Sequence, residues 1–115
     1  MNTAAARWCV LIPCLNEEAA IQSVVESVLA LGAAVIVVDD GSDDRTPQIV
    51  ATLPVTLLRQ ERRRGKGEAL RRGIREARRQ GYDAVLTMDG DGQHQASDIP
   101  RIVATARRYP AHIVI

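Results

Sequence analysis

Aromatic side chains are nearly absent from this sequence, which has no phenylalanine, one tryptophan and two tyrosines in 115 residues. A buried core must therefore be built from valine, isoleucine, leucine and alanine. The scarcity also argues against a nucleic-acid partner, because proteins that bind single strands stack the bases on aromatic rings and carry a strongly basic surface. Since the net charge is only +1, we expect that no nucleic acid is bound.

Long apolar runs and closely placed cysteines are missing as well. No apolar run approaches the roughly 20 residues that a membrane-spanning helix needs, and the start, Met1 to Arg7, lacks the pattern of a signal peptide. Cys9 and Cys14 would lie about 16 Å apart along an extended chain, which is too far for a disulfide between them. We therefore expect reduced thiols and a cytoplasmic protein, which in its full-length form could sit peripherally at the inner face of the membrane.

Strand-like and helix-like segments alternate along the whole chain. Five short apolar runs predict strands, at residues 8–12, 34–38, 55–58, 83–88 and 111–115. The segments between them carry apolar residues at the spacing of one helix face, including a last helix with Ile99, Ile102, Val103 and Ala106 on that face. This alternation predicts one α/β domain over residues 1–115, with a Rossmann-like, doubly wound, mainly parallel sheet of about five strands and helices on both faces.

Particular residues are suited to the ends of these elements. Pro13 should end the first strand, because proline cannot donate to a sheet ladder. Asn16 and Thr46 are suited to cap the helices that follow the first and second strands. Gly73 lies on the apolar stripe of the helix after the third strand, so we expect that helix to pack closely on the sheet.

Acidic residues follow three of the predicted strands: Glu17 after the first, Asp39 and Asp40 after the second, and Asp89 and Asp91 after the fourth. In doubly wound sheets, ligands bind beyond the carboxyl ends of the strands, so these side chains should meet at one edge. Two carboxylates one residue apart suit a hard divalent cation, whereas a surface turn is the alternative for that stretch taken alone. Three acidic turns at one edge favour the metal site.

A basic segment lies among these acidic turns in the chain. Residues 59–79 contain ten lysines or arginines and three glutamates, a net charge of +7, which leaves −6 for the remainder. A basic segment beside acidic strand ends suits a diphosphate and a metal ion in one site. Solvent exposure is the simpler explanation for most of these arginines, and Arg62 to Arg64 could also meet anionic lipid at a membrane surface.

Four stretches of the chain, taken together, resemble a known family. They are Ile12–Glu18 (IPCLNEE), Val37–Thr46 (VVDDGSDDRT), Gly65–Leu70 (GKGEAL) and Met88–His94 (MDGDGQH). In this order and at this spacing they resemble the nucleotide-sugar half of inverting family 2 glycosyltransferases, most closely the branch of dolichyl- and polyprenyl-phosphate sugar synthases. The resemblance covers nearly the whole chain. It implies a GT-A fold, a nucleoside-diphosphate sugar as donor, Mg²⁺ or Mn²⁺ as cofactor, and transfer of the sugar to an acceptor, which in this branch is a polyprenyl phosphate.

The resemblance also implies roles for the residues of the last motif. Asp91 would be the main metal ligand and the catalytic residue, and Asp89 would touch the metal or the ribose. Gln93 would be a third metal ligand, whereas His94 would not be one, because imidazole is not a ligand that Mg²⁺ prefers. Gly90, between the two aspartates, would leave room for the diphosphate.

The other motifs would hold the nucleotide. Asp39 would accept a hydrogen bond from the base, Asp40 would lie near the ribose or the base, and Lys66 would either reach the diphosphate or stay solvated. The rest of the pocket wall would be formed by Pro13, Asn16 and Glu17.

The family continues into an acceptor-binding half, and the sequence stops before it. We therefore expect donor binding without sugar transfer, no assignable acceptor site or general base, and self-association through an uncovered edge strand near Ile113 and Val114. Two alternatives stay open: a non-catalytic nucleotide-binding stub, and a glycosyltransferase that acts on a glycan or another non-lipid acceptor. A phosphorelay receiver is excluded, because such a protein needs an aspartate after its third strand, where this chain has Leu58 and Arg59.

Overall fold

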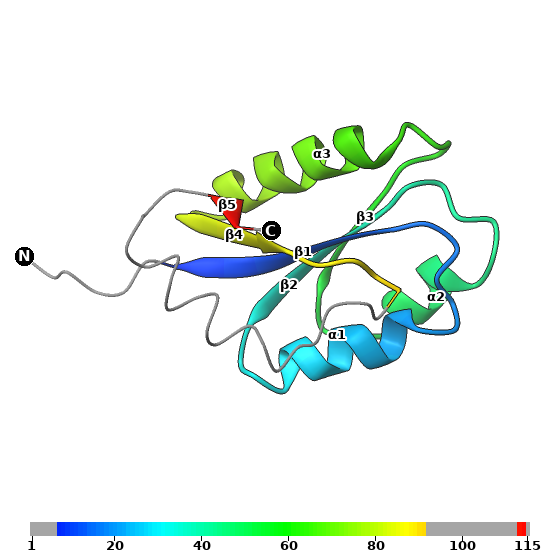
Figure 1. Ribbon diagram of the computed structural model, residues 1–115, viewed down its shortest axis with the longest axis horizontal. Helices are drawn as coiled ribbons and strands as arrows, with labels where there is room; N and C mark the ends of the chain where they lie inside the picture. Colours follow the sequence, from blue (N-terminus) through cyan, green and yellow to red (C-terminus); the bar gives the residue numbers. More distant parts are fainter. Residues whose placement is uncertain (1–6, 92–112, 115) are drawn as a thin grey trace, which may run out of the picture.

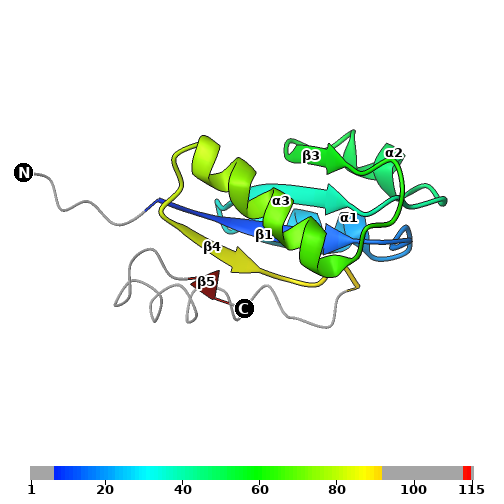
Figure 2. The same ribbon diagram turned by 90° about the horizontal axis from the view of Figure 1, so that it is seen from above.

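The computed structural model describes residues 7–91 and 113–114, which form a parallel sheet with helices packed against it (Figure 1). The elements in chain order are β1 (Trp8–Cys14), α1 (Ile21–Leu29), β2 (Ala34–Asp39), α2 (Thr46–Val50), β3 (Thr56–Arg59), α3 (Lys66–Arg79), β4 (Ala84–Thr87) and β5 (Ile113–Val114). The strands lie in the order β3-β2-β1-β4-β5, and every neighbouring pair is parallel (Figure 2). The predicted fold class is thereby confirmed, while the predicted helix that includes Ile99 and Ile102 lies outside the described residues.

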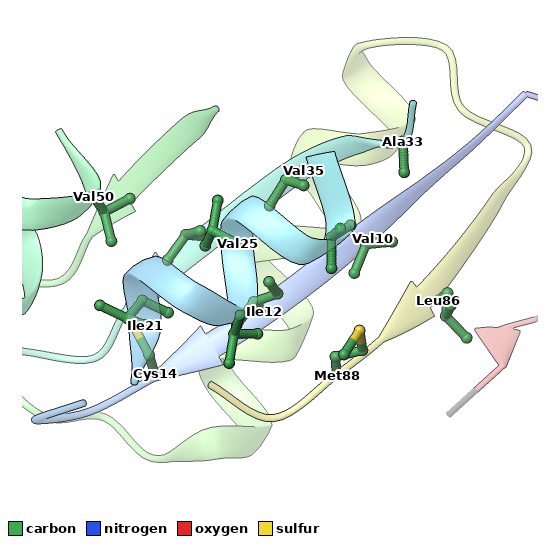
Figure 3. Packing of buried hydrophobic residues seen from close by; sticks show 13 residues of the cluster. Val10, Ile12, Cys14, Ile21, Val25, Ala33, Val35, Val50, Leu86 and Met88 are labelled. Atoms are coloured by element: carbon green, nitrogen blue, oxygen red, sulfur yellow. The ribbon is translucent and has the colours of Figure 1, made fainter. Parts of the chain in front are cut away.

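Helices cover both faces of the sheet. In Figure 1, α3 packs on one face and α1 and α2 lie on the other. Successive residues of β1 point to opposite faces, so Val10 and Ile12 belong to the core under α1, and Leu11 belongs to the core under α3. Figure 3 shows the first of these cores, with Val25 of α1 beside the residues of β1. Because helices cover both faces of the sheet, the sequences of its strands are continuous apolar runs. Within residues 7–91, none of the helices has the length and apolar character needed to cross a bilayer.

The close packing predicted at Gly73 is confirmed. A Cβ atom at this position would lie 2.2 Å from Cδ1 and 2.7 Å from Cδ2 of Leu11, whose side chain is fully buried. The backbone of α3 therefore rests directly on the sheet at this point. The buried stripe of the helix consists of small residues, Ala69, Gly73 and Ala77.

The prediction that Pro13 ends the first strand is wrong, because β1 runs through Pro13 to Cys14. The C=O of Leu11 accepts a hydrogen bond from the N–H of Met88 at 3.0 Å, so Leu11 turns its backbone polar groups toward β4. Two residues further on, the missing N–H of Pro13 faces the same side. Pairing of β1 with β4 stops at Leu11 and Thr87, so proline removes no ladder hydrogen bond there.

The predicted caps Asn16 and Thr46 do not cap helices either. α1 begins only at Ile21, with Ala20 in the N-cap position, and Asn16 lies in the preceding turn with a φ of 53°. α2 begins with Thr46 itself, whose N–H donates to a carboxylate oxygen of Asp44 at 2.9 Å. A neighbouring aspartate therefore takes the capping role that the sequence assigns to the threonine.

The two cysteines are free thiols, as predicted, and lie on opposite faces of the sheet. Burial raises the pKa of Cys9 to about 11. Burial, followed by the charge of the nearby Asp39, raises the pKa of Cys14 to about 12. Both thiols are therefore protonated at neutral pH, which makes them poor nucleophiles.

Candidate functional site

A cleft of about 410 Å³ opens beyond the carboxyl ends of β1, β2 and β4, beside the N-terminus of α3. It lies where the strand order reverses, because β2 and β3 extend the sheet to one side of β1 and β4 extends it to the other. Ligands of doubly wound sheets bind at such a switch point. The wall of the cleft consists of Pro13, Cys14, Leu15, Glu17, Asp40, Arg63, Gly65, Lys66, Ala69, Asp89, Gly90 and Asp91.

Most of the residues that the sequence indicates come together here. Those that line the cleft are Pro13, Glu17, Asp40, Lys66, Asp89, Gly90 and Asp91. Asn16 and Asp39 lie behind or beside the wall without forming it, and Gln93 and His94 lie outside the described residues. The acidic turns after three different strands therefore do meet at one edge of the sheet.

Asn16 shapes the cleft by joining two of its loops. Its φ of 53° is in the left-handed region, which asparagine tolerates better than most residues. Its side-chain Oδ1 accepts hydrogen bonds from the N–H of Asp43 at 3.0 Å and of Asp44 at 3.3 Å, and its own N–H donates to Oγ of Ser42 at 2.8 Å. The loop after β1 is thereby fastened to the loop after β2.

Asp39 is fully buried behind the wall. Its carboxylate accepts hydrogen bonds from the N–H and the hydroxyl of Ser42 and lies 3.7 Å from Nε of Arg59. The thiol of Cys14 lies against it at 3.9 Å. These contacts make Asp39 an anchor of the turn after β2, and the hydrogen bond to a base stays a prediction.

The neighbouring Asp40 does face the cleft, and it also holds the loop after β3. Its Oδ1 accepts hydrogen bonds from Nε2 of Gln60 at 2.6 Å and from the N–H of Arg64 at 2.7 Å, and its Oδ2 accepts one from the N–H of Gly65 at 3.1 Å. Gln60 is only 4% exposed. The sequence did not lead us to Gln60, whose only signal is its place directly after an apolar strand.

Carboxylates gather at the mouth of the cleft. Burial raises the pKa of Glu17, and the charges of Asp91, Asp44 and Asp89 raise it further. The N–H of Glu17 donates to the buried hydroxyl of Thr46 at 2.9 Å, which fixes the backbone at this point. The like charges around Glu17 repel one another, and a bound cation would relieve that repulsion.

The described carboxylates suit a cation that completes its coordination with water and phosphate. Asp89 and Asp91 offer the hard oxygen ligands that Mg²⁺ and Mn²⁺ prefer. In the described ranges, 7–91 and 113–114, no three side chains of His, Cys, Asp or Glu come close enough to cage a metal ion. Since Mg²⁺ is commonly held by one or two carboxylates and the phosphates of a substrate, Asp89 and Asp91 fit this role. Coordination by Gln93 stays a prediction.

Gly90 lines the cleft, but the room that it makes lies toward the core. A Cβ atom at Gly90 would lie 3.1 Å from Cβ of Cys14 and 3.3 Å from Cδ1 of Ile21. The glycine therefore lets the turn after β4 close against β1 and α1, with Asp89 and Asp91 on either side. Space for a diphosphate at this residue stays a prediction.

Arg63 and Lys66 form the basic part of the wall. Nζ of Lys66 lies 2.8 Å from Oδ1 of Asp89, an ion pair between the first turn of α3 and the turn after β4. The N–H groups of the first turn of α3 add partial positive charge on the same side. Basic and acidic groups thus share one cleft, an arrangement that suits a diphosphate bridged by a metal ion.

Comparison with known proteins identifies the family of this chain. The sequence profile of the family described as Glycosyl transferase family 2 matches residues 9–115. The chain is 32% identical over 111 residues to a UDP-N-acetylglucosamine–dolichyl-phosphate N-acetylglucosaminyltransferase of Methanococcus voltae, covering 81% of this chain and 44% of that protein. It is 31% identical over 102 residues to the dolichol-phosphate mannosyltransferase of Pyrococcus furiosus, covering 82% and 28%.

A solved structure of a glycosyltransferase is also similar to this chain. The glucosyl-3-phosphoglycerate synthase of Mycobacterium tuberculosis, crystallised with Mn²⁺, UDP and glucosyl-3-phosphoglycerate, matches the chain with a TM-score of 0.71 and 30% identity. The match covers 88% of this chain and 39% of that one. The chain therefore spans less than half the length of each of these three proteins.

Proposed function

The chain belongs to glycosyl transferase family 2, and on this basis we propose that it binds a nucleoside-diphosphate sugar with Mg²⁺ or Mn²⁺ for transfer of the sugar to an acceptor. The observation that carries the proposal is that Asp89, Asp91 and Lys66 share one cleft at the carboxyl ends of parallel strands. Mn²⁺ and UDP in the crystal structure of the mycobacterial relative support the same classes of ligand here.

The proposed complex assigns a task to each wall of the cleft. A divalent cation held by Asp89 and Asp91 would neutralise the charge that develops on the leaving diphosphate. Lys66 and Arg63 bind the outer phosphate oxygens, since charge-assisted hydrogen bonds to phosphate are among the stronger ones. Asp40 presents a carboxylate oxygen to the ribose or the base.

The proposed acceptor is a polyprenyl phosphate, presented to a cytoplasmic protein at the surface of a membrane. Two relatives are named for transfer to dolichyl phosphate or dolichol phosphate, which supports this choice, whereas the mycobacterial relative was crystallised with glucosyl-3-phosphoglycerate. Incubation with radiolabelled UDP- or GDP-sugars and either polyprenyl phosphate or 3-phosphoglycerate separates the two. We expect this 115-residue chain to form neither product, and any product from a longer chain to be lipid-linked; a product on phosphoglycerate would overturn the lipid acceptor.

The metal assignment is tested with Asp91→Asn. Calorimetry with UDP and GDP, with Mn²⁺ and with chelator, should show metal-dependent binding by the wild type. The substitution should weaken that binding at least roughly tenfold, because even the outer partners of metal ligands contribute that much, and it should change little in chelator. Asp83→Asn is the matched control, since Asp83 lies at the opposite end of β4 and accepts a hydrogen bond from the N–H of Arg7. Equal binding by Asp91→Asn and wild type in Mn²⁺ would remove Asp91 from the metal site.

A further inference from the structure

Gln60 is a buried polar residue whose side chain binds a residue of the cleft wall. It follows the last residue of β3, is 4% exposed, and does not belong to the cleft wall. Its backbone N–H donates to the C=O of Asp39 at 2.9 Å, which continues the pairing of β3 with β2 by one residue. Its side-chain amide donates to Oδ1 of Asp40 at 2.6 Å. A buried amide with a fixed backbone can orient the group that it binds.

Asp40, the partner of Gln60, divides its carboxylate between the basic loop and the cleft. An ionised carboxylate has about four lone-pair sites. Gln60, Arg64 and Gly65 donate to three of them, and the residue also lines the cleft. The same carboxylate thus fixes the backbone just before Lys66 and faces the nucleotide site.

The loop that Asp40 holds also presses on the turn after β2. Gly41 has a φ of +80°, and a Cβ atom there would lie 2.7 Å from the carbonyl carbon of Arg62 and 2.8 Å from the backbone nitrogen of Arg63. The backbone of the loop therefore packs directly against the backbone of the turn after β2. No side chain of its own reaches the core at Arg62, Arg63 or Arg64, all of which are exposed. In the part of the chain that the structure describes, Asp40 and Gly41 both hold the backbone of this loop.

From this arrangement we propose that Gln60 is a positioning residue for the cleft: it holds Asp40 so that its carboxylate seats the basic loop, and the loop in turn places Arg63 and Lys66 against the diphosphate. The proposal rests on the proposed nucleotide-binding function for its last step only. The seating of the loop by Gln60 is a property of the protein without any ligand, and it can be measured without one.

The first measurement is limited trypsin digestion of the 115-residue chain, with the sites identified by mass spectrometry. Gln60→Met keeps the size of the side chain and removes its donor. Loss of a hydrogen bond to a charged group should speed cleavage after Arg62, Arg63 and Arg64 by about tenfold. Gln80→Met is the matched control, because Gln80 is half-buried and is likewise bonded through its amide, to Thr56 and Glu76, but lies at the far end of α3.

The second measurement is the affinity for UDP in Mn²⁺. Gln60→Met should weaken it by about tenfold, the worth of one hydrogen bond to a charged group. Gln80→Met should leave the affinity for UDP unchanged, even if both variants lower the melting temperature by the same amount. If Gln60 contributed only to stability, the two variants should show the same change in loop cleavage and in affinity for UDP. Gln60→Glu gives an independent variant, since it keeps the shape but places a second carboxylate against Asp40, and should open the loop at least as far at neutral pH.

The outcomes separate the inference from the proposed function. Faster cleavage confined to the loop, with weaker UDP binding, supports both. A wild type that binds no nucleotide contradicts the proposed function, while the digestion still decides whether Gln60 seats the loop. Unchanged cleavage and unchanged affinity in Gln60→Met and Gln60→Glu would overturn the inference.

Discussion

Lys66 is the only lysine of the chain, and its ion pair with Asp89 joins the side chain proposed for phosphate to one proposed for metal. Lys66→Met should therefore have opposite effects on two ligands. Affinity for Mn²⁺ alone should rise about two- to fivefold, because a competing cation is removed from a partly exposed pair. Affinity for UDP in Mn²⁺ should fall about tenfold, because a charge-assisted hydrogen bond is lost. Titration of Mn²⁺ by electron paramagnetic resonance, and calorimetry for UDP, check the two signs.

Lys66→Arg is the control for this prediction, since it keeps the charge and should leave the Mn²⁺ affinity near that of the wild type. Parallel changes in both affinities for Lys66→Met would show that the ion pair does not compete with the metal.

Glu17 gives a pH-dependent prediction. Its pKa is raised in the folded protein by burial and then by Asp91, Asp44 and Asp89, so the ionised form is disfavoured by folding. The destabilisation is absent below the unfolded pKa and complete above the folded one. Glu17→Gln should therefore raise the melting temperature at pH 8 by roughly 2 °C, as expected for a few tenths of a kcal/mol in a domain of this size. The gain should vanish as the pH falls toward 4.

Thermal melts followed by circular dichroism over this pH range measure the effect. Glu26→Gln, on the exposed side of α1, should change the melting temperature at neither pH. A gain for Glu17→Gln that persists at pH 4 would mean that charge repulsion at the cleft is not its cause.

At the scale of residues, the sequence predicts the composition of the site better than the direction of each side chain. Asp40, Asp89 and Asp91 could be placed at the cleft because they follow apolar strands. Asp39 and Asp40 are adjacent, however, and adjacent residues at a strand end point to opposite sides. Only the three-dimensional register shows that Asp39 turns inward to Ser42 while Asp40 faces the cleft.

At the scale of elements, α3 and β1 pack very closely at Gly73. Gly73→Ala would place a methyl carbon 2.2 Å from a buried leucine side chain, and overpacking of this kind destabilises by about 1–3 kcal/mol. This loss should exceed the gain of up to about 1 kcal/mol from better helix propensity. Urea denaturation should therefore show a lower midpoint for Gly73→Ala.

Gly67→Ala is the matched control within the same helix. A Cβ atom at Gly67 would meet only the guanidinium of Arg71, at 3.8 Å. The propensity gain should then appear alone, and the midpoint should rise. A higher midpoint for both variants would contradict the close packing of α3 on the sheet.

The helix starts show why element boundaries were harder to predict than element types. Polar residues such as Asn16 and Thr46 are read as caps because their side chains satisfy backbone N–H groups. In this fold they do bind backbone N–H groups, but those of neighbouring loops: Asn16 binds Asp43 and Asp44, and Thr46 binds Glu17. Spacing along the chain does not indicate which partners tertiary structure will supply.

At the scale of the whole molecule, charge is distributed unevenly along the chain. The segment from β3 to the end of α3 carries +7, and the rest of the chain carries −6. Glu68 and Glu76 are paired with arginines of α3, and this helix lies on one face of the sheet (Figure 2). Among the described residues, α3 and the basic loop are therefore the basic part of the protein. Self-association through β5, at one edge of the described sheet, stays a prediction that sedimentation velocity over a range of concentrations checks.

This uneven distribution predicts that the chain binds anionic membranes through α3 in spite of its near-zero net charge. Co-sedimentation with phosphatidylcholine vesicles should be weak, and addition of phosphatidylserine should strengthen it in a way that salt reverses, because each arginine near such a surface contributes about 1 kcal/mol. Arg78 is exposed, and within residues 7–91 no carboxylate pairs with it, so Arg78→Gln should weaken binding about fivefold. Arg45→Gln, at the start of α2 on the opposite layer, should leave it unchanged. Equal losses for the two variants would mean that binding follows net charge alone and that α3 does not face the membrane.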